Sequence, residues 1–162
     1  MSPLVGVGGI VVHEKRILLV QRGTEPLKGQ WTIPGGLIDV GETLREAVIR
    51  EVREETGLSV EPIELVELLD RIHREGERVR YHYVIADYLC RWDGGVLLPG
   101  SDAAAARWVE RAEWNSHTHP VDEDPSPGTP ASALRIDPIT TRVMEAAWQR
   151  ARSIEGRTGE SL

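Results

Sequence analysis

The stretch that decides the fold is GLIDVGETLREAVIREVREETGL, residues 36–58. Thr43 is followed three residues later by Glu46, which is the spacing of a capping box at a helix N-terminus. The residues from Leu44 to Thr56 include neither glycine nor proline, and Gly57 stands where a left-handed C-cap belongs. The stretch therefore predicts a helix over residues 44–56.

The predicted helix carries acidic side chains beside its apolar stripe. At about 100° of rotation per residue, Leu44, Val48 and Val52 form one stripe. Three carboxylates crowd one edge of it, those of Glu51, Glu54 and Glu55. Like charges at this spacing repel, and half-buried carboxylates are costly. A hard divalent cation such as Mg²⁺ removes both costs, because it takes oxygen ligands and keeps waters that a phosphate can replace.

Helical geometry alone leaves two interpretations open. The carboxylates could belong to a solvated surface helix, salt-bridged by Arg45, Arg50 and Arg53. The flanking sequence favours a ligand site instead. Pro34-Gly35-Gly36 precedes the helix, and glycine lets backbone groups approach a ligand closely. A strand, a glycine loop and an acidic helix in succession predict a phosphate–metal site.

The rest of the chain predicts an α/β sandwich around a mixed sheet. We expect one domain over residues 1–153, an irregular loop over 115–135 and a flexible tail over 154–162. The expected strands are Val5–Val12, Ile17–Gln21, Trp31–Ile33, Ser59–Leu69 with a bend at Pro62, Arg78–Leu89 and Ala106–Val109, with a turn at Trp92–Gly95 and a C-terminal helix over 139–152.

Composition narrows the classes of partner. The 162 residues carry a formal charge of −7, which argues against a broad surface for nucleic acid. The first residues lack the basic region of a signal peptide, and no apolar run is long enough to span a membrane. The single cysteine, Cys90, cannot form an intramolecular disulfide. We therefore expect a soluble cytoplasmic protein that binds a small molecule.

Gly36, Glu42 and the run from Arg50 to Leu58 together resemble the Nudix box without a departure. Weaker similarity extends upstream through Leu19–Gly23 and Gly29–Trp31, and downstream to Arg107–Val109. The resemblance implies a Nudix-type α/β/α sandwich and an enzyme that cleaves a diphosphate linkage in a nucleoside diphosphate derivative. Family members commonly form homodimers, so a homodimer is expected as well.

The resemblance also implies roles for particular residues. Glu51, Glu54 and Glu55 would hold Mg²⁺ or Mn²⁺ together with the backbone carbonyl of Gly35. Arg50 would orient a carboxylate through a charge-assisted hydrogen bond, and Glu42 would be a structural acid. Arg22 and Gly36 would contact the substrate phosphates, although Arg22 is also consistent with a strand-end surface residue. The base that takes a proton from water would be Glu51, Glu54 or Asp102, and Asp102 also fits a turn.

Other side chains have ordinary structural explanations. Trp31 fits the core as well as a base-stacking site, His82 fits a sheet position, and Cys90 fits a small buried residue. The loop residues His117, His119, Asp122 and Asp124 match no zinc spacing and are expected to be solvated.

Three functions remain to be weighed. The first is a Mg²⁺-dependent pyrophosphohydrolase, with ADP-ribose or a nucleotide sugar as the preferred substrate and a nucleoside triphosphate as the alternative. The second is a nucleotide-sensing domain that binds without cleaving, against which the intact glutamates argue. The third is a structural partner protein that makes contact through the acidic loop at Asp122–Asp124. Only the composition supports this third function.

Overall fold

The computed structural model describes residues 1–24, 27–100, 102–115 and 134–162. Within these residues one mixed sheet has seven strands, in the order β3-β2-β1-β6-β5, with β4 paired to β1 and β7 paired to β2. The pair β1–β6 is parallel and the other pairs are antiparallel. The strands are β1 (Leu4–His13), β2 (Arg16–Arg22), β3 (Trp31–Thr32), β4 (Gly35–Leu37), β5 (Leu58–Glu75), β6 (Arg78–Gly95) and β7 (Ala103–Glu110).

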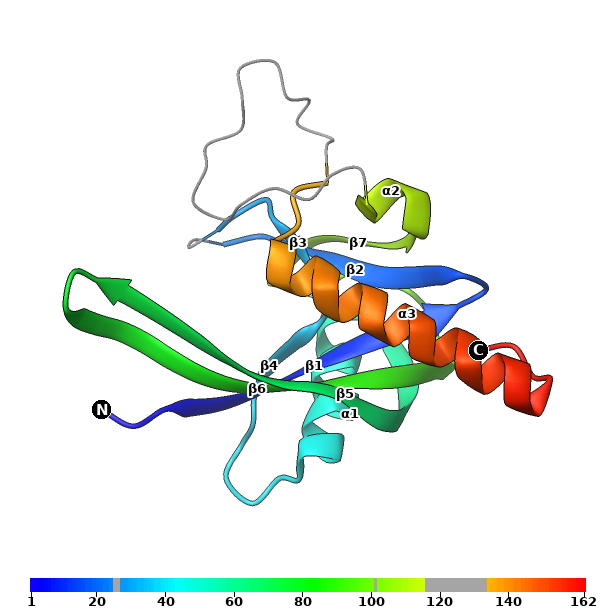
Figure 1. Ribbon diagram of the computed structural model, residues 1–162, viewed down its shortest axis with the longest axis horizontal. Coiled ribbons are helices and arrows are strands. Elements are labelled where there is room, and N and C mark those ends of the chain that lie inside the picture. Colours follow the sequence, from blue (N-terminus) through cyan, green and yellow to red (C-terminus); the bar gives the residue numbers. More distant parts are fainter. Residues whose placement is uncertain (25–26, 101, 116–133) are drawn as a thin grey trace, which may run out of the picture.

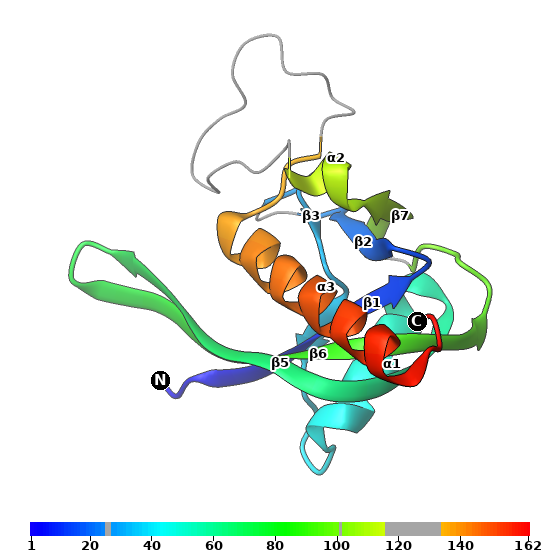
Figure 2. The ribbon, with the colours of Figure 1, turned by 45° about the vertical axis from the view of Figure 1, so that its right-hand side comes forward.

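Helices α1 (Leu44–Thr56) and α3 (Pro138–Thr158) cover opposite faces of this sheet, and the short α2 (Arg111–Asn115) follows β7 (Figures 1 and 2). Alternation along the strands explains the two layers. On β1, Ile10 and Val12 pack in the core cluster of α3, whereas Val11 packs in that of α1. The predicted α/β/α sandwich is therefore confirmed.

Helix α1 begins and ends as its sequence predicts. Thr43 Oγ1 accepts a hydrogen bond from the Glu46 N–H at 3.2 Å, and Glu46 Oε2 accepts one from the Thr43 N–H at 2.8 Å. Gly57 has φ 77° and donates its N–H to the Arg53 carbonyl. Ala47, Val48 and Val52 form the buried face of α1 and pack in one core cluster with residues of the sheet.

Two predicted strands are longer than expected. Strands β5 and β6 form a hairpin (green in Figure 1) that extends away from the body of the sheet. The expected turn at Trp92–Gly95 is wrong, because β6 continues to Gly95 and pairs there with Leu58 of β5. The expected bend near Pro62 coincides with a register shift between Pro62 and Glu64.

The C-terminal prediction also requires correction. Helix α3 continues to Thr158 and ends at Gly159, which has φ 72°, so residues 154–158 are helical. Leu162 is buried, and its carbonyl accepts a hydrogen bond from the Glu14 N–H at 3.0 Å. The expected tail over 154–162 is therefore packed against the domain, because a C-cap at Gly159 turns the chain back onto the core.

The expected loop over 115–135 lies mostly outside the described residues. Asn115 ends α2, and Leu134 is buried beside Ile136 in the core cluster of α3. His117, His119, Asp122 and Asp124 fall outside the part of the chain that the structure describes. No helix of the described segments combines the length and apolar content needed to cross a bilayer.

Candidate functional site

The site is built where α1 faces β4. Strand β4 was expected to be a glycine loop, but it pairs with β1 through Gly8–Gly35 and Val7–Gly36. A Cβ at Gly36 would lie 2.5 Å from the carboxyl carbon of Glu51. The Glu51 carboxylate thus occupies the space beside Gly36, and a side chain at that position would displace it. The bare backbone and the acidic helix edge therefore lie directly against each other.

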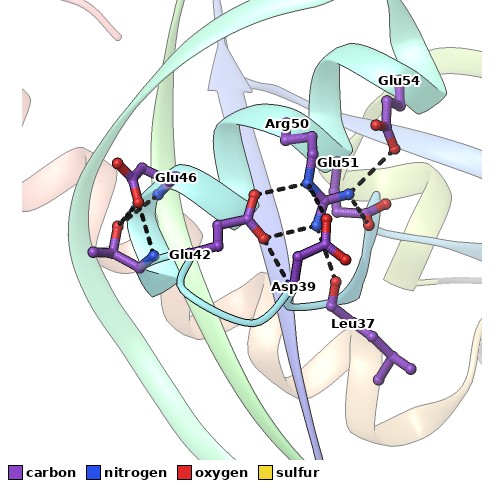
Figure 3. Close-up of polar contacts among 8 residues, drawn as sticks. Leu37, Asp39, Glu42, Glu46, Arg50, Glu51 and Glu54 are labelled. Carbon is purple, nitrogen blue, oxygen red and sulfur yellow. Dashed lines mark hydrogen bonds and ion pairs between the residues drawn. The ribbon is translucent and has the colours of Figure 1, made fainter.

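Arg50 is the centre of an ion-pair network on this edge (Figure 3). Its Nε and Nη2 donate to the two carboxylate oxygens of Glu42 at 2.7 and 2.9 Å. Its Nη1 donates to Glu51 Oε1 at 2.6 Å and to Glu54 Oε2 at 3.3 Å, and its Nη2 also donates to the Leu37 carbonyl at 3.0 Å. Arg50 thus places two helix carboxylates and ties them to the end of β4.

Glu42 has the structural position expected of it. Arg50 donates to its carboxylate, and so does the Asp39 N–H at 3.0 Å. These bonds lower the pKa of Glu42 to about 2, with the Arg50 hydrogen bond the larger cause. Glu42 is therefore a charged anchor for Arg50, and its side chain is only 14% exposed.

Glu55 has the opposite electrostatic environment. Its Oε2 accepts a hydrogen bond from the Gly35 N–H at 3.2 Å. Burial raises the pKa of Glu55 to about 7, and the negative charges of Glu51 and Asp102 add to that rise, while the Gly35 N–H and the Arg22 charge oppose it. A carboxylate held where its charge is poorly compensated is one that a bound cation would stabilise.

Most of the residues predicted for the site lie in the same region of the fold, around the α1–β4 contact. Gly35, Gly36, Glu51 and Glu55 lie at the α1–β4 contact, and Glu54 is more exposed, at 59%. Arg22 and Asp102 both lie close enough to Glu55 to change its pKa. The Asp102 segment is held there because the Gly100 N–H donates to the Glu55 carbonyl at 2.8 Å and the Gly23 N–H donates to the Asp102 carbonyl at 3.2 Å.

The donor set is suited to a hard cation, although its side chains do not converge. Glu51, Glu54 and Glu55 offer only carboxylate oxygens, which Mg²⁺ and Mn²⁺ accept. Across the described residues, however, no three acidic, histidine or cysteine side chains stand close enough to hold a metal ion. Glu51 is instead bound to Arg50. The oxygen chemistry and the elevated pKa of Glu55 fit a divalent cation, and the roles of the individual residues stay predictions.

Two adjoining hollows open beside this edge. The wider one, of about 440 Å³, is lined by Gly36 and Leu37 of β4 and by Tyr81, Tyr83 and Ile85 of β6, among others. The narrower one, of about 200 Å³, reaches toward the N-terminus of α3 and is lined by polar residues that include Arg71, Asp87 and Asp137. Arg22, Leu27, Arg71 and Ile85 line both, so the two hollows adjoin each other.

Sequence reasoning missed the polar lining of the narrower hollow. Asp87 is only 5% exposed. The sequence pattern that could have marked it is a single acidic residue within an apolar strand segment. Arg71 Nη1 donates to Asp137, which caps α3, and its Nη2 donates to Thr140 Oγ1 at 3.1 Å. Nothing local marks that cluster, because Arg71 and Asp137 are 66 residues apart.

The secondary candidates have structural explanations. Trp31 is buried in the core and lies under the Arg107 guanidinium, 5.3 Å from its ring centroid. His82 pairs with Asp70, with 2.8 Å between Nε2 and Oδ1. His82 is not among the residues that line the two hollows described above. Cys90 is buried, and burial raises the pKa of its thiol to about 12.

The sandwich fold and the acidic helix α1 packed against Gly35 and Gly36 of β4 are features of a Nudix domain. The NUDIX domain profile matches residues 2–129 of this chain. The chain therefore belongs to the Nudix family. It is 37% identical over 111 residues to an ADP-ribose pyrophosphatase of Methanocaldococcus jannaschii, over 68% of this chain and 63% of that protein. It is 35% identical over 106 residues to a MutT-like protein of Streptomyces ambofaciens, over 65% of this chain and 62% of that protein.

A solved structure supports the same assignment. The MutT NUDIX hydrolase of Burkholderia pseudomallei superposes with a TM-score of 0.65 at 28% identity, covering 90% of this chain and 98% of that one. The two sequence relatives are longer than their matched parts, since the aligned region spans under two thirds of each. The domain is therefore shared with these proteins over most of its length.

Proposed function

We propose that this chain is a divalent-cation-dependent pyrophosphohydrolase that cleaves the diphosphate linkage of a nucleoside diphosphate derivative, with ADP-ribose or a nucleotide sugar as its substrate. The observation that carries the proposal is the α1–β4 contact. There Glu51 lies against the bare backbone of Gly36, and Glu55 has a pKa raised to about 7. The relative named an ADP-ribose pyrophosphatase supports the choice of substrate.

The residues at the contact have complementary tasks. Glu51, Glu54, Glu55 and the Gly35 carbonyl would hold the cation, Mg²⁺ or Mn²⁺. When bound, it supplies positive charge to the diphosphate oxygens and a water of lowered pKa. The absence of a side chain at Gly36 lets the diphosphate approach the helix edge.

Two further residues, Arg22 and Asp102, have charges that act on Glu55. Arg22 would contact a phosphate, because its charge reaches Glu55 and it lines both hollows. Glu51, Glu54 and Asp102 remain the candidates for the base that accepts the proton of the attacking water. Asp102 is exposed and lies beside Glu55, so its position is compatible with that role.

The test is a substrate panel with Mg²⁺ containing ADP-ribose, nucleotide sugars, dinucleotides and nucleoside triphosphates. Products are separated by chromatography. Cleavage of ADP-ribose to AMP and ribose 5-phosphate, abolished by EDTA, is the expected result. Preferred cleavage of triphosphates would favour the alternative, a house-cleaning nucleotide pyrophosphatase. Tight binding of one compound without turnover of any would favour a nucleotide sensor.

The homodimer and the cytoplasmic location remain predictions of this proposal. Light scattering coupled to size-exclusion chromatography measures the first, and fractionation of cells measures the second. A monomer at all concentrations would overturn the expected dimer without affecting the assignment of the site.

A further inference from the structure

The narrower hollow holds a buried carboxylate, that of Asp87, which has no role in the proposed site at the α1–β4 contact. Asp87 lies on β6 opposite Gly8 of β1, and a Cβ at Gly8 would come within 2.2 Å of Asp87 Oδ1. The side chain therefore occupies the space that the glycine leaves. The residue is only 5% exposed, yet it lines a hollow of about 200 Å³.

The arginine whose charge acts on Asp87 donates its hydrogen bonds to other residues. The Arg71 guanidinium donates to Asp137 and Thr140, so it reaches Asp87 only through its charge. Among the residues that the structure describes, none donates a hydrogen bond to the Asp87 carboxylate. Burial raises the pKa of Asp87 to about 6. The Asp87 oxygens are still reached from the hollow. A ligand that supplies donors there would offset the cost of holding this carboxylate at low exposure.

The hollow has the size and polarity for one hydroxylated ring. Its volume is below the roughly 300–1,000 Å³ that holds a whole drug-sized ligand. Its lining includes Asp87, Thr140 and Gln30, which carry polar side chains, together with Trp31. A carboxylate accepts from two adjacent hydroxyls at once, so vicinal hydroxyls match this lining.

The narrower hollow also lies close to the α1–β4 contact. It adjoins the wider hollow at Gly36, with which it shares Arg22, Leu27, Arg71 and Ile85. A diphosphate beside Gly36 could therefore extend its terminal group toward Asp87. Residues at the N-terminus of α3 line the narrower hollow, and two of them, Asp137 and Thr140, accept hydrogen bonds from Arg71.

We propose that Asp87 determines specificity by accepting hydrogen bonds from the vicinal hydroxyls of the terminal sugar of a nucleoside diphosphate sugar. This inference rests on the proposed function and names the group that selects its substrate. Asp87 takes no part in the cleavage itself. Its contribution is confined to the moiety on the far side of the diphosphate.

The test compares ADP-ribose with ADP esterified at its terminal phosphate by an n-pentyl group, which lacks hydroxyls. The wild-type protein should have a kcat/KM at least about 10-fold higher for ADP-ribose, since hydrogen bonds to a charged group contribute roughly 10- to 100-fold. In Asp87→Asn the preference should fall to within about threefold, through loss of ADP-ribose turnover alone. Asp93→Asn on the exposed end of β6 is the matched control and should keep the wild-type preference.

Several results would overturn the assignment of Asp87. These are an equal loss on both compounds in Asp87→Asn, an unchanged preference in that variant, or no preference in the wild type. The wild-type comparison changes only the substrate, so a lack of preference there overturns the assignment even where the variant fails to fold.

Calorimetric binding of both compounds in EDTA separates this inference from the proposed function. Binding of ADP-ribose that Asp87→Asn weakens, without turnover by the wild type, would refute the hydrolase and uphold Asp87. Turnover of ADP-ribose with an unchanged preference in Asp87→Asn would uphold the hydrolase and refute the role of Asp87. A wild-type protein that neither binds nor cleaves ADP-ribose would refute both.

Discussion

Replacing Glu55 with glutamine should stabilise the metal-free protein at alkaline pH. The Glu55 carboxyl is half-buried against β4 and accepts a hydrogen bond from the Gly35 N–H at 3.2 Å. Its pKa is raised from 4.5 to about 7, chiefly by burial. Glutamine keeps an oxygen that accepts from Gly35 and removes the charge that the fold disfavours.

The size of the effect follows from the pKa of Glu55. A rise from 4.5 to about 7 corresponds to an upper bound of roughly 3 kcal/mol in the free energy of unfolding at pH 8. Solvent screening of a partly buried carboxyl reduces this to about 1–2 kcal/mol. For a chain of this size that is an increase in Tm of about 2–8 °C.

The sign of the pH dependence is specific. Because the folded-state pKa of Glu55 lies above the unfolded one, the folded protein retains the proton between about pH 4.5 and 7. The resulting stabilisation is complete below pH 4.5 and is lost as pH rises through 7. The difference in Tm between Glu55→Gln and wild type should therefore grow from pH 5 to pH 8.

Thermal unfolding in EDTA at several pH values measures this difference. Glu61→Gln, an exposed glutamate on β5, is the matched control and should follow the wild-type curve. Millimolar Mg²⁺ should then raise the Tm of the wild type and leave that of Glu55→Gln nearly unchanged, because the variant lacks one carboxylate ligand. A Glu55→Gln protein less stable than wild type at pH 8, or a difference constant across pH, would refute the reasoning.

The other predictions concern neighbouring positions. Glu54→Gln should lower the turnover of ADP-ribose with Mg²⁺ at least about 100-fold. It should change the free energy of unfolding by less than about 0.5 kcal/mol, because the Glu54 side chain is 59% exposed. Wild-type rates in this variant would refute the metal-site assignment. Arg50→Ala should cost roughly 2–3 kcal/mol in thermal or urea unfolding, since it leaves half-buried carboxylates unpaired, and full stability in Arg50→Ala would count against the network in Figure 3. Gly57→Ala should cost at least about 1–2 kcal/mol by the same measurement, because Gly57 has φ 77° and its new Cβ would meet the Val96 carbonyl oxygen at 2.4 Å; an unchanged Tm would contradict that.

Local patterns predicted the elements whose causes are local. The capping box at Thr43 and the glycine at Gly57 bound α1 correctly, since both act within one helical turn. Hydrophobic runs located the strands, but not the far end of the β5–β6 hairpin. There the chain from Ile72 to Glu75 is mostly polar and still pairs, because one strand satisfies the backbone of the other.

The sequence by itself determined the family and the glutamates of the acidic helix edge. It did not determine their electrostatic states, because Glu42 and Glu55 differ in pKa through contacts with Arg50 and Gly35 that only packing creates. The tertiary structure alone joined Arg71 of β5 to Asp137 before α3 and set Asp87 beside them. Burial and long-range pairing depend on which residues meet across the fold, and no short stretch of sequence encodes that meeting.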